Sequence, residues 1–181
     1  MTQDIKKNSE ASEVHGSPEE QRTRISLEAL DNPVLVEGLA YWRNLCGGRK
    51  FPVRSDVTPR GLKHLSRNTV LLRVIDGGAD YEIRIAGDAH VVAHGFSVQG
   101  MFWSELSKAG NRHMIERKAH YDAVVRNGEP VAISGLMAAD GRESVLLHNT
   151  ALLLPLGPDE KTVEFLLVFS VYAPNAADSK S

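Results

Sequence analysis

Apolar residues recur with a helical period between residues 33 and 46. Leu35, Leu39 and Trp42 are spaced at i, i+4 and i+7, which is the pattern of a helix that buries one face. Asn32 can accept hydrogen bonds as an N-terminal cap, the proline after it suits a first helical position, and two glycines follow the last apolar residue. The sequence therefore predicts an N-terminal helix over residues 33–46.

Five later runs are rich in β-branched, aromatic and other apolar residues and have the length of strands. They are residues 70–75, 81–86, 131–137, 144–154 and 162–172. Glycine-containing links join the first two runs, and likewise the last three, so we expect antiparallel neighbours. Helices are expected over residues 59–65, over residues 88–94 with Gly95 at the end, and from a cap at Asn111 to Gly128.

This order of elements predicts an α+β fold. We expect a five-stranded antiparallel sheet with its helices on one face and the N-terminal helix flanking it, although the pattern also suits other small α+β folds. Residues 1–25 carry many charges and almost no large apolar groups, so they are expected to form a disordered tail. One domain is expected over residues 26–173, with a C-terminal tail over residues 174–181.

Composition narrows the class of protein. The chain has 181 residues, a formal net charge of −2 and 42% hydrophobic residues, which fits one soluble domain and gives no reason to expect nucleic acid as a partner. No apolar run approaches the roughly 18 residues that span a bilayer, and no signal segment follows the N-terminus. We expect a cytoplasmic protein without membrane insertion. The single cysteine, Cys46, excludes an internal disulfide and a cysteine-based zinc site.

Two spaced motifs carry a resemblance to a known family. The first motif comprises Trp42, Gly47-Gly48-Arg49, Pro52, Arg54, Asp56 and Pro59, and the second comprises Gly87, Gly95 and Gly100. In this order, and over about residues 35–172, the chain resembles the small bacterial single-domain PAS-like proteins. The resemblance implies a PAS fold and a sensory or regulatory role, and it brings no catalytic residues. Apolar positions at Phe96 and Met101-Phe102 depart from the family pattern.

In such a fold the helical insert would cover the sheet and could enclose a ligand. Its aromatic residues are Phe96, Phe102, Trp103 and Tyr121, and Arg84 and His148 are candidate polar groups of the same pocket. The alternative is that these aromatic side chains simply fill the core. The ligand and any cofactor remain unknown at this level.

Two surfaces are candidates for contact with other proteins. The N-terminal helix spreads apolar residues around most of its circumference, so Leu35, Leu39 and Trp42 are expected to form a homodimer interface. Arg49, Arg54 and Arg60 belong to a basic block that could dock an acidic or phosphorylated partner, or could be a solvated loop. For Arg49, hydrogen bonds to backbone carbonyls are a structural alternative.

The remaining chemistry favours a regulatory protein over an enzyme. His90 and His94 have the i, i+4 spacing of metal ligands but lack a further motif, and no residue is assigned to a metal. No serine stands in the glycine frame of a hydrolase elbow, and the insert has no cysteine for flavin photochemistry. We expect a regulator without its own output domain that binds a signalling protein, with a small molecule as a further ligand. The alternatives are a small enzyme with a buried general base and a haem or metal sensor.

Overall fold

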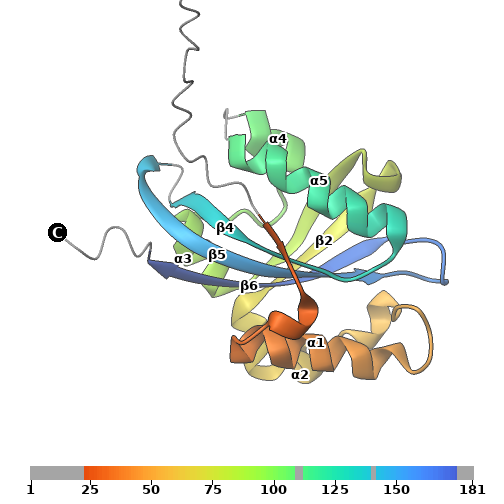
Figure 1. Cartoon of the computed structure of the whole chain (residues 1–181). Helices are drawn as coiled ribbons and strands as arrows, with labels where there is room; N and C mark the ends of the chain where they lie inside the picture. Colours follow the sequence, from red (N-terminus) through yellow and green to blue (C-terminus); the bar gives the residue numbers. More distant parts are fainter. Residues whose placement is uncertain (1–22, 109–111, 140–141, 175–181) are drawn as a thin grey trace, which may run out of the picture.

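The computed structural model describes residues 23–108, 112–139 and 142–174. Its centre is one antiparallel sheet with the strand order β1-β4-β5-β6-β2-β3 (Figure 1). The strand bounds are Thr23–Ile25 for β1, Thr69–Ile75 for β2, Asp80–Ala86 for β3, Val131–Ala139 for β4, Arg142–Leu156 for β5 and Phe165–Pro174 for β6. The α+β prediction is confirmed, with one strand more than the five expected.

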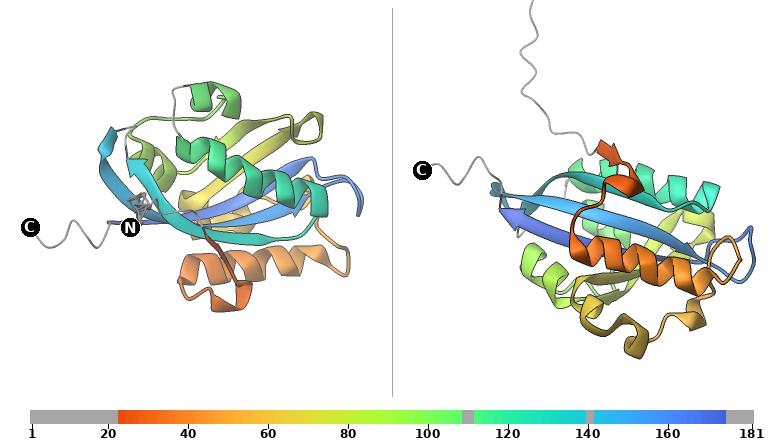
Figure 2. Two further views of the ribbon diagram at one scale, coloured as in Figure 1. Left: turned by 45° about the horizontal axis from the view of Figure 1, so that its top comes forward. Right: turned by 60° about the horizontal axis from the view of Figure 1, so that its bottom comes forward.

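Helices cover both faces of this sheet. The α-helices are α1 (Pro33–Cys46), α2 (Pro59–Leu62), α3 (Asp88–His94), α4 (Trp103–Lys108) and α5 (Arg112–Asn127), and 3-10 turns are η1 (Leu27–Ala29), η2 (Arg54–Asp56), η3 (Lys63–Asn68) and η4 (Asp76–Gly78). Helices α4 and α5 lie over one face, and α1 and α2 lie against the other (Figures 1 and 2). The N-terminal helix therefore flanks the sheet as expected, on the face opposite α5.

The reason for two covered faces lies in the central strands. Leu152, Leu153 and Leu154 of β5 are consecutive, and each is 0% exposed. Because successive side chains of a strand point to opposite faces, such a run needs an apolar cover on each side. Helix α1 supplies one cover and α5 supplies part of the other.

Helix α1 forms over the residues that the sequence predicts. The Asn32 side chain accepts a hydrogen bond from the Val34 amide at 3.0 Å, and Gly47 takes the left-handed conformation that ends the helix. The helix turns Leu35, Leu39 and Trp42 toward the sheet, where each is at most 5% exposed, and the Trp42 indole donates to the Pro155 carbonyl at 2.9 Å.

That burial corrects the predicted dimer interface. Leu35, Leu39 and Trp42 belong to the core of their own chain, so their side chains are not available to a second copy. On the outer side of α1, Val36 is 46% exposed, but it is flanked by the polar Glu37. The sequence showed that α1 has apolar surface but not that the sheet covers most of it.

The expected N-terminal tail is also too long by three residues. Thr23–Ile25 pair with Ala132–Ser134 of β4 in an antiparallel register. Backbone hydrogen bonds to the free edge of β4 hold this short strand, and none of its residues is fully buried. Hydrophobic patterning therefore gave no sign of it.

Helix α3 has the predicted bounds. It ends at His94 because Gly95, with φ of 74°, adopts the left-handed conformation and donates its amide to the Val91 carbonyl. At its other end Gly87 lies against η3, where a Cβ atom would stand 2.4 Å from the carbonyl oxygens of Ser66 and Arg67. Two of the three glycines of the spaced motif, Gly87 and Gly95, thus fix how α3 leaves the sheet. The predicted cap at Asn111 lies outside the described residues.

We expect Gly38→Ala to destabilise the protein, although alanine favours helix by about 1 kcal/mol over glycine. A Cβ atom at Gly38 would lie 2.5 Å from Cδ2 of Phe169, which is itself 0% exposed and has no room to move. Overpacking of this kind costs about 1–3 kcal/mol, so the free energy of unfolding measured with urea should fall. Ala40→Gly, at an exposed position of α1, is the matched control and should lose only the helix propensity. A Gly38→Ala variant as stable as the parent would contradict the close seating of α1 on Phe169.

Candidate functional site

A small cavity lies between the sheet and the layer of α3, α4 and α5. Its volume is about 20 Å³, which is room for about one water molecule. Most of the wall is apolar, and four polar side chains interrupt it. The lining residues are Val70, Leu72, Ile83, His90, His94, Trp103, Leu106, Arg117, Tyr121, Val168 and Ser170.

Helix α3 brings two histidines to this cavity, His90 and His94, and His90 is the more buried of the two. It is 8% exposed, its Nδ1 shares a hydrogen bond of 2.5 Å with the Tyr172 hydroxyl, and its ring lies 4.3 Å from the ring of His94. Burial, together with the positive charges of His94 and Arg117, holds the pKa of His90 well below its ordinary value. The His90 imidazole is therefore neutral at pH 7.

Arg117 of α5 brings a permanent charge to the cavity. Its side chain is 3% exposed, and its printed contact is a long hydrogen bond of 3.4 Å from Nη2 to the Tyr121 hydroxyl. Among the described residues, neither Arg117 Nε nor the buried Ser170 hydroxyl has a hydrogen-bond partner. Neither Arg117 nor Ser170 was among the pocket residues predicted from the sequence. The only signal was spacing, because Arg117 stands four residues before Tyr121 and seven before Val124 on the buried face of one helix.

An aromatic cluster forms the wall toward β3. Trp103 and Tyr121 line the cavity as predicted, with ring centroids 4.8 Å apart, and Tyr81 packs edge-on against both. The Tyr81 hydroxyl donates to Asp122 at 2.6 Å, and Lys118 pairs with the same carboxylate. Burial, followed by this hydrogen bond and the Asp122 charge, raises the pKa of Tyr81 above its ordinary range. This network fastens α5 to β3.

The other four predicted pocket residues lie elsewhere. Arg84 points outward from β3 and pairs with Glu82 at 2.7 Å, because its neighbour Ile83 takes the inward position. Phe96 is 47% exposed beyond the end of α3, and Phe102 bridges to the backbone of Glu82 at the edge of β3. His148 lies on the face of α1, where its Nε2 bonds Ser134 Oγ at 2.7 Å.

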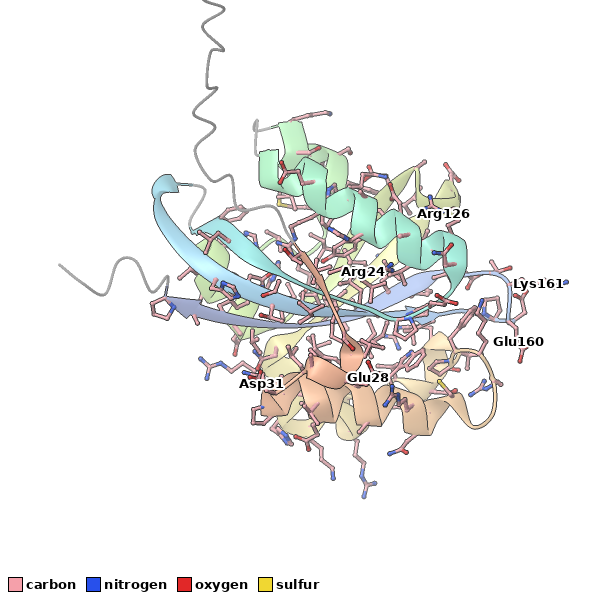
Figure 3. The ribbon with its side chains drawn as sticks, viewed as in Figure 1. Arg24, Glu28, Asp31, Arg126, Glu160 and Lys161 are labelled. Carbon is pink, nitrogen blue, oxygen red and sulfur yellow. The ribbon has the colours of Figure 1, made fainter. Side chains whose placement is uncertain are left out.

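His148 belongs to a second, open groove of about 390 Å³ on the α1 face. The N-terminal segment borders this groove, and Figure 3 labels Asp31 at the start of α1. The groove is larger than the cavity, yet its polar groups are paired: Ser134 bonds both His148 and Thr150, and Asn32 caps α1. Among the described residues, the small cavity holds two buried donor groups without a hydrogen-bond partner, Arg117 Nε and Ser170 Oγ, and such groups are a mark of a binding site.

The basic block makes mostly internal contacts. Arg49 donates to the carbonyls of Leu45 and Cys46 at 3.0 and 3.1 Å and to the Asp56 carboxylate at 2.6 Å. Arg54 donates to the Val57 carbonyl at 2.9 Å. Arg60 is exposed on α2. The structural alternative for Arg49 therefore describes its geometry, and docking of a partner by Arg49, Arg54 and Arg60 stays a prediction.

A comparison with known families assigns the fold. Residues 30–169 match the PAS domain family. The chain belongs to this family. A search of curated proteins and a search of solved structures found no match to the chain. Membership in the PAS family supports a sensory or regulatory role.

Two further observations concern the setting of the site. Among the residues that the structure describes, no group of three or more His, Cys, Asp or Glu side chains is placed to hold a metal ion. Within the same ranges, no helix combines the length and the apolar composition needed to cross a membrane.

Arg49→Ala should lower the free energy of unfolding by about 1 kcal/mol, because the last turn of α1 loses two donors to its carbonyls and the ion pair with Asp56. The value is modest since the Arg49 side chain is 43% exposed. Arg60→Ala is the matched control and should change stability by less than about 0.5 kcal/mol. Denaturation of both variants in urea measures the difference. Equal stability of the two would show that the Arg49 contacts contribute nothing.

Proposed function

We propose that this PAS protein senses a small molecule in the cavity between the sheet and α3, α4 and α5, and passes the change to a protein partner through α3. One observation carries the proposal: a polar cluster of His90, Arg117 and Ser170 is enclosed in an otherwise apolar core.

Such a cluster is costly unless a guest completes it. A buried hydroxyl or amide without a hydrogen bond costs about 1–3 kcal/mol, and a buried charge costs more. At the neighbouring aromatic cluster the buried polar groups are paired, as Tyr81 and Asp122 are. Ser170 Oγ and Arg117 Nε are not, and the space beside them has the volume of one water molecule. A guest that supplies acceptors there offsets the cost.

Helix α3 is suited to transmit the presence of a ligand in the cavity to the protein surface. Its inner side brings His90 and His94 to the cavity wall, while Val92 on its outer side is 72% exposed and Phe96 just beyond it is 47% exposed. Exposed apolar groups of this size favour contact with another protein. Helix α3 is only seven residues long and contacts β6 and η3, so few contacts oppose a change in its position.

Formation of a homodimer remains a prediction, but the surface now expected at its interface is Val92 and Phe96 in place of the buried Leu35, Leu39 and Trp42. We expect a dimer at micromolar concentration in sedimentation equilibrium, and we expect the double variant Val92→Ser and Phe96→Ser to be monomeric with an unchanged melting temperature. Val36→Ser, which removes an exposed valine from α1, is the control and should remain dimeric. A monomeric parent protein would rule out the homodimer and leave the surface to a different protein. A dimer that survives the double change would place the contact outside α3.

Ligand binding is tested by native mass spectrometry of the freshly purified protein. We expect a mass above that of the chain, released on denaturation, which identifies the guest. Ser170→Leu fills the space with an apolar side chain and should remove the added mass, whereas Val171→Leu, on the next residue and the other face of β6, should retain it. An adduct unaffected by Ser170→Leu would mean that the guest binds elsewhere. No adduct, and no change in melting temperature with an extract of cellular metabolites, would contradict sensing in this cavity.

A further inference from the structure

We infer that the guest of this cavity is a short-chain carboxylate whose head group pairs with Arg117. The inference rests on the proposed function, because it names the class of molecule that the same cavity binds.

Among the residues that the structure describes, no carboxylate pairs with the buried guanidinium of Arg117. It is 3% exposed, and arginine stays charged in proteins. In the described part of the chain no ion pair joins Arg117 to a carboxylate, and its single hydrogen bond goes to the neutral Tyr121 hydroxyl. The nearby carboxylates are committed to other partners: Asp122 to Lys118 and Tyr81, Glu82 to Arg73 and Arg84, and Asp80 to Ser104.

The neighbouring polar groups favour an anion over any other guest. His90 and His94 lie at the same cavity, and a cation would be repelled by Arg117. Arg117 Nε and Ser170 Oγ each have a hydrogen to donate, and neither has an acceptor among the described residues. A guanidinium donor and a hydroxyl donor at one cavity match the two oxygens of a carboxylate.

The size and the lining of the cavity limit which anions can bind. A volume of about 20 Å³ is room for about one water molecule, so the head group takes the place of that water and each further carbon atom has to displace an apolar side chain of the wall, which favours the shortest carboxylates over a phosphate ester with its own substituents. The remaining wall is apolar, with Leu72, Ile83 and Leu106 around the polar cluster. A carboxylate with a short alkyl chain satisfies both parts, because its oxygens meet the donors and its carbons meet the leucine and isoleucine side chains.

The test titrates the protein with sodium acetate, propionate and butyrate and with the corresponding neutral amides. Sodium chloride keeps the ionic strength constant. Binding is followed by the melting temperature and by tryptophan fluorescence, to which Trp103 at the cavity wall and Trp42 of α1 both contribute. We expect at least one carboxylate to raise the melting temperature and its amide to have no effect at the same concentration.

Arg117→Met removes the charge and keeps a long apolar side chain. We expect its affinity for the carboxylate to fall at least about tenfold, because a hydrogen-bonded charge pair is lost. Without carboxylate its melting temperature should equal or exceed that of the parent, since an unpaired buried charge has been removed. Arg126→Met, at an exposed position of α5 (Figure 3), is the control and should bind as the parent does. If Arg117→Met does not fold, Arg117→Lys replaces it and should also bind more weakly.

The outcomes distinguish a failure of the carboxylate inference from a failure of the proposed function. Equal binding of carboxylate and amide, or undiminished binding by the Arg117 variant, would overturn the carboxylate and leave a ligand in the cavity. An Arg117-dependent rise in melting temperature with chloride alone would identify a halide site and also overturn it. If no carboxylate and no amide binds, and native mass spectrometry finds no adduct, both the inference and the proposed function fail.

Discussion

The pairing of β5 with β6 is the constraint on which the rest of the structure depends. Ten residue pairs join these strands, and the leucines at their centre are buried on both faces. A sheet of this kind is unstable with one face in water, so α1 has to close one side and the insert between β3 and β4 the other. Because Phe169 presses directly on Gly38, the α1 side is tightly packed. The small cavity is found on the other side, where α3, α4 and α5 meet the sheet.

The elements of the fold were predictable where local chemistry determines them. Helices α1 and α3 have the predicted bounds, because Asn32 caps the first and Gly95 ends the second. The side of the sheet that each element covers was not predictable. In β5 every residue from Ala151 to Leu154 is apolar, so alternation does not distinguish its faces. The strand β1 escaped notice because backbone pairing with β4, and no apolar pattern, holds it.

Only part of the candidate site could be predicted, because the sequence does not show which face of the sheet a side chain lies on. Trp103 and Phe96 are both aromatic residues of the insert, yet one is 4% exposed and the other 47%, and only the direction of the chain after Gly95 decides between them. Arg84 and His148 were assigned to the pocket by residue type, while strand alternation turns both away from it. Arg117 was overlooked because arginine on a helix is usually solvent-exposed.

A buried arginine that has no counter-ion within the described ranges is more informative than the size of the cavity around it. Replacing Arg117 by an apolar residue would leave α5 with a continuous apolar stripe through Tyr121 and Val124, and such replacements of buried charges are often neutral or stabilising. Stability therefore gives no reason for an arginine at this position. Residues that break the usual rules of burial are expected at functional sites. There the protein loses some stability, and the residue makes its interaction only when a ligand is bound. Because Arg117, Ser170 and His90 come from α5, β6 and α3, a guest that joins them also joins the two covering helices to the central sheet. In the function proposed above, occupancy of the cavity would change how firmly α3 is held, and the exposed Val92 of α3 and Phe96 just beyond it form the surface proposed for a partner.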